Sequence, residues 1–201
     1  MPAEHLTVFV VDDDPSIRDS LALMLGIAGY RTALFADAEA FLAGTLPEMT
    51  GCVVADLKLP GKSGLELQAE LRRRGIALPV VIITAHGDVP AARAAFHAQA
   101  VDFLEKPFEQ RQLCAAIDAA FGIEEKRLEQ RIDKELLARL TPREREVLDA
   151  VAQGLHAKEI GAALQISPRT VEVHKTRIME KLGARNVAEL VRFSLAGSGR
   201  R

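Results

Sequence analysis

The stretch VFVVDDDPS, residues 8–16, sets three consecutive carboxylates directly behind a run of apolar residues that is rich in valine. Such a run predicts a buried β-strand, so the three acids are expected at the carboxyl end of that strand. Like charges this close repel one another and raise each other's pKa unless a cation lies among them. The acidic run therefore predicts a cation bound among these carboxylates, as part of a divalent-metal site.

Short apolar runs recur along the first 122 residues and alternate with segments of helical spacing. The runs cover residues 6–11, 32–36, 52–57, 79–84 and 101–104, and the helical segments cover 15–28, 38–45, 64–74, 89–98 and 109–121. Five strands alternating with five helices predict a doubly wound α/β fold with a five-stranded parallel sheet, of the flavodoxin-like kind. The expected strand order is 2-1-3-4-5.

The strand pattern stops near residue 122. Residues 124–140 are dense in helix formers, which fits either a helical connector continuing from the fifth helix or an ordinary amphipathic surface helix. Thr141, Pro142 and Glu144 then form a capping-box signature, and four short helices are expected up to about residue 195. We expect a domain over 1–122, a helical linker over 123–140 and an all-α, four-helix helix-turn-helix domain over 141–201.

Composition and charge separate the two ends of the chain. Hydrophobic residues make up 48% and charged residues 27%, and no apolar run approaches the roughly 18 residues that span a bilayer. The N-terminus lacks a signal-peptide layout, so a cytoplasmic protein without a membrane partner is expected.

Residues 1–140 carry 15 Lys and Arg against 21 Asp and Glu, a net of −6, whereas residues 141–201 carry 11 against 7, a net of +4. The basic end suggests a polyanionic partner. Cys52 and Cys114 have no metal-ligand spacing and are expected to be buried thiols.

The expected strand order brings polar residues from separate strand ends together. Ligands of doubly wound sheets gather beyond the carboxyl ends of the strands, so the acids after strand one should converge on Asp56, with Thr84 and Lys106 to one side. Carboxylate oxygens that leave room for water suit Mg²⁺. A carboxylate beside Mg²⁺, a lysine and a hydroxyl can accept a phosphoryl group, and Asp56 is the natural nucleophile.

Four stretches carry a resemblance to a known family. The segments VVDDDPSIR, VVADLKLPGKSGLEL, VIITAHGD and VDFLEKPF resemble the receiver domain of two-component response regulators, most closely the FixJ type of the NarL/FixJ family, over residues 6–122. The resemblance implies that Asp56 is the phosphoacceptor and that a cognate sensor histidine kinase phosphorylates it. It also implies that the protein has no enzymatic activity other than the uptake and loss of its own phosphoryl group. It implies an Mg²⁺ site in which Asp13 binds directly and Asp12 helps through water, completed by Asp56 and the Lys58 backbone carbonyl. Thr84 and Lys106 would contact the phosphoryl group, with Lys106–Pro107 in cis.

Three further residues near this site are open to two interpretations. Phe103 matches the family's aromatic switch position, which implies that it turns inward when Thr84 moves; it also fits a plain core residue of strand five. Asp14 matches no family role and is expected to cap the first helix or to face solvent. His86 stands alone and is expected on the surface, although it could tune the loop after strand four.

The basic end has the layout of a helix-turn-helix in KEIGAALQISPRTVEVHKTRIMEKLG, residues 158–183. Gly161, Ala162 and Ala163 would let two helices approach, and Ser167 would cap the second helix. Val171, Ile178 and Leu182 form an inward apolar stripe, which leaves Arg169, Glu172, Val173, Lys175, Thr176 and Arg177 exposed. Such a face suits a DNA major groove. The alternative is a small helical docking module whose charges are solvated.

Residues 141–195 resemble the LuxR-type DNA-binding domain, through LTPREREVL and the segment just quoted. The resemblance implies a recognition helix from about Pro168 to Leu182. Glu172, Val173 and Thr176 would face bases. The backbone-contact candidates are Lys158, Arg169, His174, Lys175, Arg177 and Lys181.

Together the two resemblances predict a transcriptional regulator gated by phosphorylation. Phosphorylation of Asp56 would favour a homodimer, formed through a face around residues 91–104. This homodimer would bind promoter double-stranded DNA and act with RNA polymerase, as an activator rather than a repressor. One alternative is a haloacid-dehalogenase-type phosphatase with Asp12 as nucleophile; it leaves Asp56 without a task and lacks an Asp pair after Lys106. Another is a phosphorylation-gated adaptor that binds protein or RNA.

Overall fold

The computed structural model describes residues 6–46, 48–85, 93, 95 and 97–197. Contacts divide the chain into two compact units, Met1–Lys126 and Arg127–Arg201. His86, most of the helix expected over 89–98 and part of the expected dimer face lie outside the described residues. No helix in the described part of the chain is long and apolar enough to cross a membrane.

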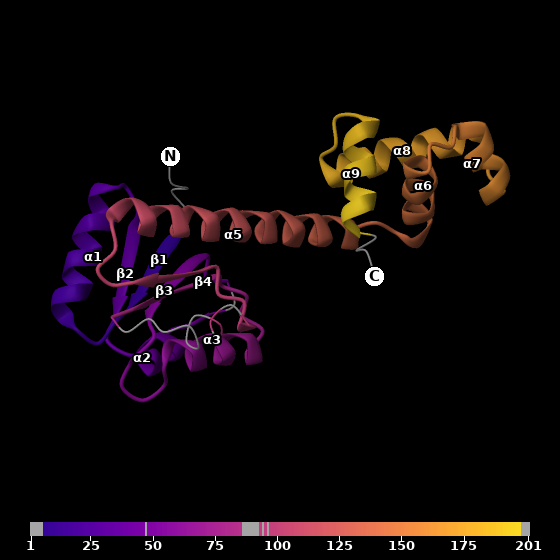
Figure 1. Cartoon of the computed structure of the whole chain (residues 1–201). Helices are drawn as coiled ribbons and strands as arrows, with labels where there is room; N and C mark the ends of the chain where they lie inside the picture. Colours follow the sequence, from indigo (N-terminus) through magenta and orange to yellow (C-terminus); the bar gives the residue numbers. More distant parts are fainter. Residues whose placement is uncertain (1–5, 47, 86–92, 94, 96, 198–201) are drawn as a thin grey trace. The chain divides into compact units, whose positions relative to one another are not determined.

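The N-terminal unit is built on a parallel sheet (Figure 1). Its strands are β1 (Thr7–Val11), β2 (Arg31–Phe35), β3 (Gly51–Asp56), β4 (Val80–Thr84) and β5 (Asp102–Glu105), and its helices include α1 (Pro15–Ile27), α2 (Ala38–Ala43), α3 (Gly64–Arg73) and the start of α5 (Gln110–Ala138). The strand order is β2-β1-β3-β4-β5 with every pairing parallel, which confirms the predicted fold and order.

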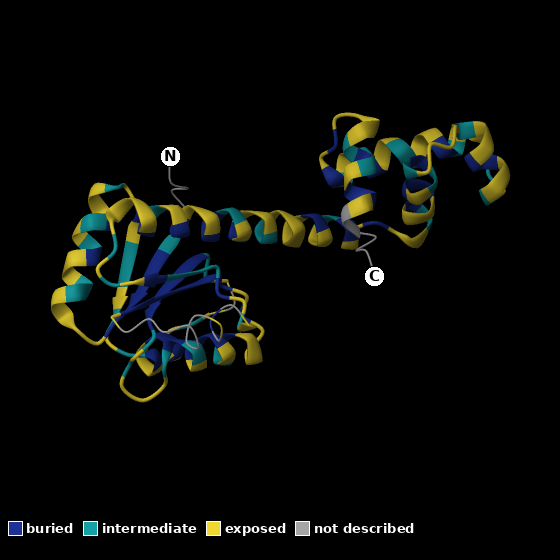
Figure 2. Cartoon of the chain, viewed as in Figure 1, coloured by how far each residue is buried: buried dark blue, intermediate teal, exposed yellow. Residues whose placement is uncertain are grey.

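Helices cover both faces of this sheet. In Figure 1, α1 and α5 lie on one face, and α2 and α3 lie on the other. All residues of β3 and β4 are buried, as Figure 2 shows, which explains why these strands are almost uninterrupted apolar runs. On the α2–α3 face, Phe41 packs against the rings of Phe9 and Phe35, with centroids 5.7 and 5.1 Å apart. The burial of both faces fixes the register of the strands.

Helix α5 runs without a break from Gln110 to Ala138, so the segment expected as a connector continues from the fifth helix of the sheet unit. Leu128, Ile132 and Leu136 recur every four residues along this segment; Ile132 is 53% exposed, and Leu128 and Leu136 are half-buried. Leu137, in the last turn, is buried in the core of the C-terminal unit. The connector thus contributes to that core with its final turn.

The C-terminal unit packs four further helices: α6 (Pro142–Ala152), α7 (Ala157–Leu164), α8 (Pro168–Leu182) and α9 (Val187–Gly197). The predicted capping box is present, because Thr141 Oγ1 accepts from Glu144 N and the Glu144 carboxylate accepts from Thr141 N. Ile160, Val171 and Ile178 are among the residues of a shared apolar core. All four predicted helices are therefore found, within two residues of their expected ends.

The two cysteines differ, which corrects the prediction that both are buried. Cys52 is buried in β3, but Cys114 is only partly buried. The difference follows from helix geometry, because Leu113, Ala116 and Ile117 take the inward positions of α5 and leave Cys114 at the flank.

Candidate functional site

The carboxyl ends of four strands meet at one edge of the sheet. Asp12 follows β1, Asp56 ends β3, Thr84 ends β4 and Lys106 follows β5. Because the strands are parallel and in register, these residues lie at the same edge. The predicted convergence is observed for the first acid of the triple run and for the three residues from the other strands.

Lys106 joins two of these carboxylates. Its Nζ donates to Asp12 Oδ2 at 2.7 Å and to Asp56 Oδ2 at 2.6 Å. Asp12 is fully buried and Asp56 is only 8% exposed. Burial raises the pKa of Asp12 above its ordinary value, although the hydrogen bond from Lys106 opposes that shift. For Lys106, burial alone would lower the pKa, but the two carboxylates outweigh it and raise the pKa, so the ammonium stays charged at neutral pH.

Backbone amides orient the other oxygen of each carboxylate. Asp56 Oδ1 accepts from Lys58 N at 2.8 Å, and Asp12 Oδ1 accepts from Asp14 N at 3.0 Å. Each carboxylate is thus held between one backbone N–H and one ammonium, which fixes its direction before any ligand binds.

Gly64, at the start of α3, lets that helix lie against Asp56. A Cβ at this position would lie 2.5 Å from the Asp56 carbonyl oxygen and 3.3 Å from Ile82 Cδ1. The first contact is shorter than real Cβ atoms allow, so glycine is required here. The sequence did not indicate that Gly64 is needed for this close approach, although the neighbouring Ser63 and Glu66 form a capping box that marks the start of the helix.

The three acids of the run lie in three different environments. Asp12 is buried, Asp13 is exposed, and Asp14 caps α1 by accepting from Ser16 N at 2.8 Å. The cap is one of the two environments predicted for Asp14. Arg18 adds a contact that the sequence did not suggest, because its Nη1 donates to the Asp12 carbonyl oxygen at 2.6 Å.

The carboxylates provide part of a metal-ion donor set. Within the residues that the structure describes, no group of three or more His, Cys, Asp or Glu side chains is placed to hold a metal ion. Asp12 Oδ2 and Asp56 Oδ2 nevertheless converge on one cationic centre, the Lys106 ammonium. Carboxylate oxygens of this kind, with the exposed Asp13 next to them, fit Mg²⁺, which keeps several of its waters.

Thr84 and Phe103 lie on the two strands at the far side of the cluster. Thr84 is fully buried, and its carbonyl oxygen accepts from Lys106 N at 2.7 Å. Phe103 is half-buried and packs against the sheet core next to Ile82, its partner in the ladder. In this arrangement Phe103 packs as a core residue, and its switch role stays a prediction. The Lys106–Pro107 peptide is cis, as the resemblance implies.

Helices α7 and α8 form a compact helix-turn-helix. A Cβ on Gly161 would lie 2.7 Å from the Ile166 carbonyl oxygen, so this glycine is what allows the close approach; Ala162 and Ala163 are exposed and do not contribute. Gln165 turns the chain in the left-handed conformation with φ of 55°. Ser167 Oγ then caps α8 by accepting from Thr170 N at 3.0 Å.

The faces of α8 divide largely as predicted. Val171, Ile178 and Leu182 are buried. The exposed side chains on this helix include Arg169, Glu172, Val173, Thr176 and Arg177, and Lys158 is exposed on α7. Lys175 is half-buried instead of exposed, because it lines a hollow beside Val151 and Leu155. Its Nζ donates to Glu172 Oε1 at 3.0 Å. His174 is also half-buried, and its Nδ1 has no hydrogen-bond partner among the described residues.

Lys181 differs from the other predicted DNA contacts. Its Nζ donates to Glu144 Oε2 at 2.6 Å, and Glu144 is only 3% exposed. The Lys181 hydrogen bond, aided by Thr141, lowers the pKa of Glu144 to about 2. Lys181 thus joins α8 to the cap of α6, a pairing that the 37-residue separation hid from the sequence.

Comparison with known families matches both units. The response regulator receiver domain family matches residues 8–118, and the LuxR family of bacterial regulatory proteins matches residues 138–194. The transcriptional regulatory protein FixJ of Azorhizobium caulinodans is 43% identical over 96% of this chain and 93% of its own length; FixJ of Rhizobium meliloti is 44% identical, over 95% and 96%. The chain belongs to the FixJ-type response regulators.

Solved structures agree with this family assignment. The response regulator StyR is 41% identical with a TM-score of 0.73, covering 94% of this chain and 98% of its own. Full-length FixJ from B. japonicum is 40% identical with a TM-score of 0.60, covering 99% and 100%.

As a FixJ-type response regulator, the chain is a phosphorylation-dependent transcriptional regulator with a receiver domain and a LuxR-type DNA-binding domain. A histidine kinase and DNA are therefore its partner classes. This assignment favours the regulator interpretation over the phosphatase and adaptor alternatives.

Proposed function

We propose that Asp56 of this response regulator accepts the phosphoryl group of its histidine kinase, and that the acyl phosphate controls DNA binding by the C-terminal unit. The observation that carries the proposal is the Lys106 ammonium, held by Asp12 and Asp56 at one edge of the sheet. During transfer the P–N bond of a phosphohistidine breaks while phosphorus forms a bond to an Asp56 carboxylate oxygen. Lys106 offsets charge on the phosphoryl oxygens, and Thr84 supplies a hydroxyl to one of them.

Mg²⁺ is the proposed cofactor of this step. Asp13 and Asp56 would bind it directly, Asp12 through water, and the Lys58 carbonyl would complete the protein ligands. When bound, the ion neutralises charge on the phosphoryl group. Because both carboxylates raise the pKa of Lys106, its ammonium is charged when the phosphoryl group arrives. Beyond uptake and loss of its own phosphoryl group, we propose no enzymatic activity.

In the C-terminal unit, we propose that α8 enters the major groove of promoter DNA. The exposed Glu172, Val173 and Thr176 would face bases, while exposed cations contact phosphates. The best-placed cations are Lys158, Arg169 and Arg177. His174 and Lys175 are partly buried, and Lys181 would first have to leave Glu144.

Phosphorylation is proposed to favour a homodimer. The homodimer would bind DNA more tightly than the monomer, because it presents two recognition helices to two half-sites. The dimer would work in the cytoplasm with RNA polymerase, as an activator.

A labelling experiment tests the phosphoacceptor. The full chain is incubated with acetyl phosphate, with and without Mg²⁺, and its intact mass is followed. Labelling is expected to require Mg²⁺ and to disappear in Asp56→Asn. The matched control is Asp14→Asn, which removes a neighbouring charge but keeps a side-chain oxygen for the α1 cap. Labelling of Asp56→Asn would overturn the assignment.

Selection of bound duplexes from random DNA, with and without acetyl phosphate, tests the gating. Phosphorylated wild type is expected to select a two-half-site sequence that Asp56→Asn binds weakly. Equal affinity of Asp56→Asn and phosphorylated wild type would refute gating and leave the DNA assignment intact.

A further inference from the structure

Asp12, the buried acid of the cluster, has all four of its polar atoms paired. Its N–H donates to the Phe35 carbonyl oxygen at 3.2 Å, and its carboxylate accepts from Asp14 N at 3.0 Å and from Lys106 Nζ at 2.7 Å. The fourth atom, its carbonyl oxygen, accepts from Arg18 Nη1 at 2.6 Å. Arg18 makes this contact from the first turn of α1, and no role proposed above uses it.

Arg18 holds the chain on both sides of Asp13. Its side chain binds the Asp12 carbonyl oxygen, which belongs to the peptide that leads into Asp13, and its own N–H donates to the Asp14 carbonyl oxygen at 3.1 Å. Asp13 itself is exposed, and within the described part of the chain its carboxylate has no hydrogen-bond partner. The direction of this carboxylate therefore depends on the backbone that Arg18 holds.

The Arg18 side chain binds a neutral group although acids surround it in the sequence. Aspartates stand at positions 12, 13, 14 and 19, yet the half-buried Arg18 forms no ion pair with a described residue and donates to a carbonyl oxygen instead. An arginine that served only to offset the acidic run would pair with a carboxylate, for which its fork of donors is suited. A charged donor on a carbonyl oxygen fixes the orientation of that peptide group.

We propose that Arg18 is a positioning residue for the Mg²⁺ site, because it holds the Asp12–Asp13 peptide and so fixes the direction of the Asp13 carboxylate. The inference rests on the function proposed above, in which Asp13 binds Mg²⁺ directly. Groups that orient metal ligands contribute about ten- to a hundredfold to metal affinity. Arg18 acts through the backbone and not on the carboxylate itself, so a contribution of about tenfold is expected.

The charge of Arg18 allows this role to be tested by the direction of an effect. A cation close to the acidic run repels Mg²⁺, so loss of the charge alone would tighten Mg²⁺ binding. Loss of a group that orients Asp13 would weaken Mg²⁺ binding instead. Arg18→Met removes the charge and the donors together, so the direction of the change in Mg²⁺ affinity separates the two effects.

The affinity is measured by titrating the unphosphorylated full chain with magnesium chloride and following the amide NMR cross-peaks of residues 12–14. Arg18→Met is expected to weaken Mg²⁺ binding about tenfold. Arg18→Lys keeps the charge and a donor, and it is expected to restore most of the affinity, to within about threefold of the wild type.

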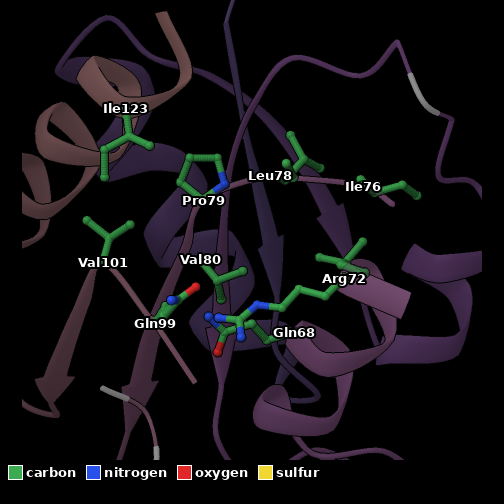
Figure 3. Close-up of a pocket in the computed structure, with 11 residues that line it drawn as sticks. Gln68, Arg72, Ile76, Leu78, Pro79, Val80, Gln99, Val101 and Ile123 are labelled. Atoms are coloured by element: carbon green, nitrogen blue, oxygen red, sulfur yellow. The ribbon is translucent and has the colours of Figure 1, made fainter. Parts of the chain in front are cut away.

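The matched control is Arg72→Met on α3. Arg72 also forms no ion pair with a described residue, but it lines a mostly apolar pocket at the far end of the sheet (Figure 3). Val80, at the same pocket, begins β4, whereas Thr84 ends that strand at the acidic cluster. Arg72→Met makes the same chemical change as Arg18→Met away from the acids, so it should leave Mg²⁺ affinity unchanged.

Labelling by acetyl phosphate gives a second measurement. In Arg18→Met the Mg²⁺ concentration that gives half of the maximal labelling rate should rise about tenfold. The rate at saturating Mg²⁺ should stay that of the wild type, because Asp56 and Lys106 keep their contact. A contact that only stabilises the fold would lower the unfolding free energy of the receiver without moving this Mg²⁺ midpoint.

Unchanged or tighter Mg²⁺ binding by Arg18→Met would overturn the proposal, and so would an equal loss of affinity in Arg72→Met. A labelling rate that stays low in Arg18→Met at saturating Mg²⁺ would also overturn it. Because Mg²⁺ is titrated without a phosphodonor, the two proposals can fail separately. A wild type that binds Mg²⁺ but is never labelled would refute the proposed function, while the titration would still decide the role of Arg18.

Discussion

Replacing Glu144 with glutamine removes one charge from the C-terminal unit while keeping an oxygen for the α6 capping box. In the wild type, the Glu144 carboxylate accepts from Lys181 Nζ at 2.6 Å, from Thr141 N at 2.8 Å and from Thr141 Oγ1 at 3.0 Å. Led by the Lys181 hydrogen bond, these contacts lower the pKa of Glu144 from 4.5 to about 2.

This shift sets the size and the pH range of the effect. Taken alone it corresponds to about 3 kcal/mol of unfolding free energy, and solvent screening of the partly exposed Lys181 reduces this to about 1–2 kcal/mol. Because the folded pKa is the lower one, the charged Glu144 stabilises the unit fully above pH 4.5. That contribution is lost as the pH falls from 4.5 toward 2.

The assay must report on the C-terminal unit alone. The chain has no Trp and a single Tyr, Tyr30 in the receiver, so fluorescence cannot serve. Urea unfolding is therefore monitored through the NMR cross-peaks of residues in α6 and α8. At pH 7 the unfolding free energy of Glu144→Gln is expected to be about 1–2 kcal/mol lower than that of the wild type. The difference should vanish near pH 2.

The matched control is Glu146→Gln on the same helix. Its carboxylate pairs with Arg143 at 2.6 Å, but both side chains are exposed, at 52% and 36%, so the expected change is near zero. If Glu144→Gln loses no more than Glu146→Gln, or if its loss stays constant down to pH 2, the buried pair does not stabilise the unit as argued.

Three further substitutions have distinct expected outcomes. Asp14→Ala should cost the receiver about 1 kcal/mol in urea unfolding, through the lost α1 cap, with acetyl phosphate labelling intact; loss of labelling would contradict its role as a cap only. Gly161→Ala should destabilise the C-terminal unit by about 1–3 kcal/mol in the same NMR titration and weaken DNA binding in gel shifts, because its Cβ meets the Ile166 carbonyl; unchanged affinity would count against the close approach. Arg169→Gln should reduce the slope of log affinity against log salt by about one, and an unchanged slope would remove Arg169 from the phosphate contacts.

Most of the fold could be predicted because its signals are local. Continuous apolar runs such as residues 79–84 identify strands buried on both faces, and Thr141 with Glu144 identifies a helix start within four residues. The candidate site was predictable for a related reason, since parallel strands bring their carboxyl ends to one edge and therefore bring Asp56 and Lys106 together.

The sequence by itself determined the order of the elements, the edge of the sheet where Asp12, Asp56 and Lys106 meet, and the inward stripe of α8, because each depends on periodicity or on strand direction. Only the tertiary structure decided which charges are already paired. Lys181 looked like one more cation of the recognition helix until folding placed it on Glu144, and Gln68 looked ordinary until packing buried its acceptor. Partners such as these are separated along the chain, and their pairing depends on how whole helices pack, which no local pattern encodes.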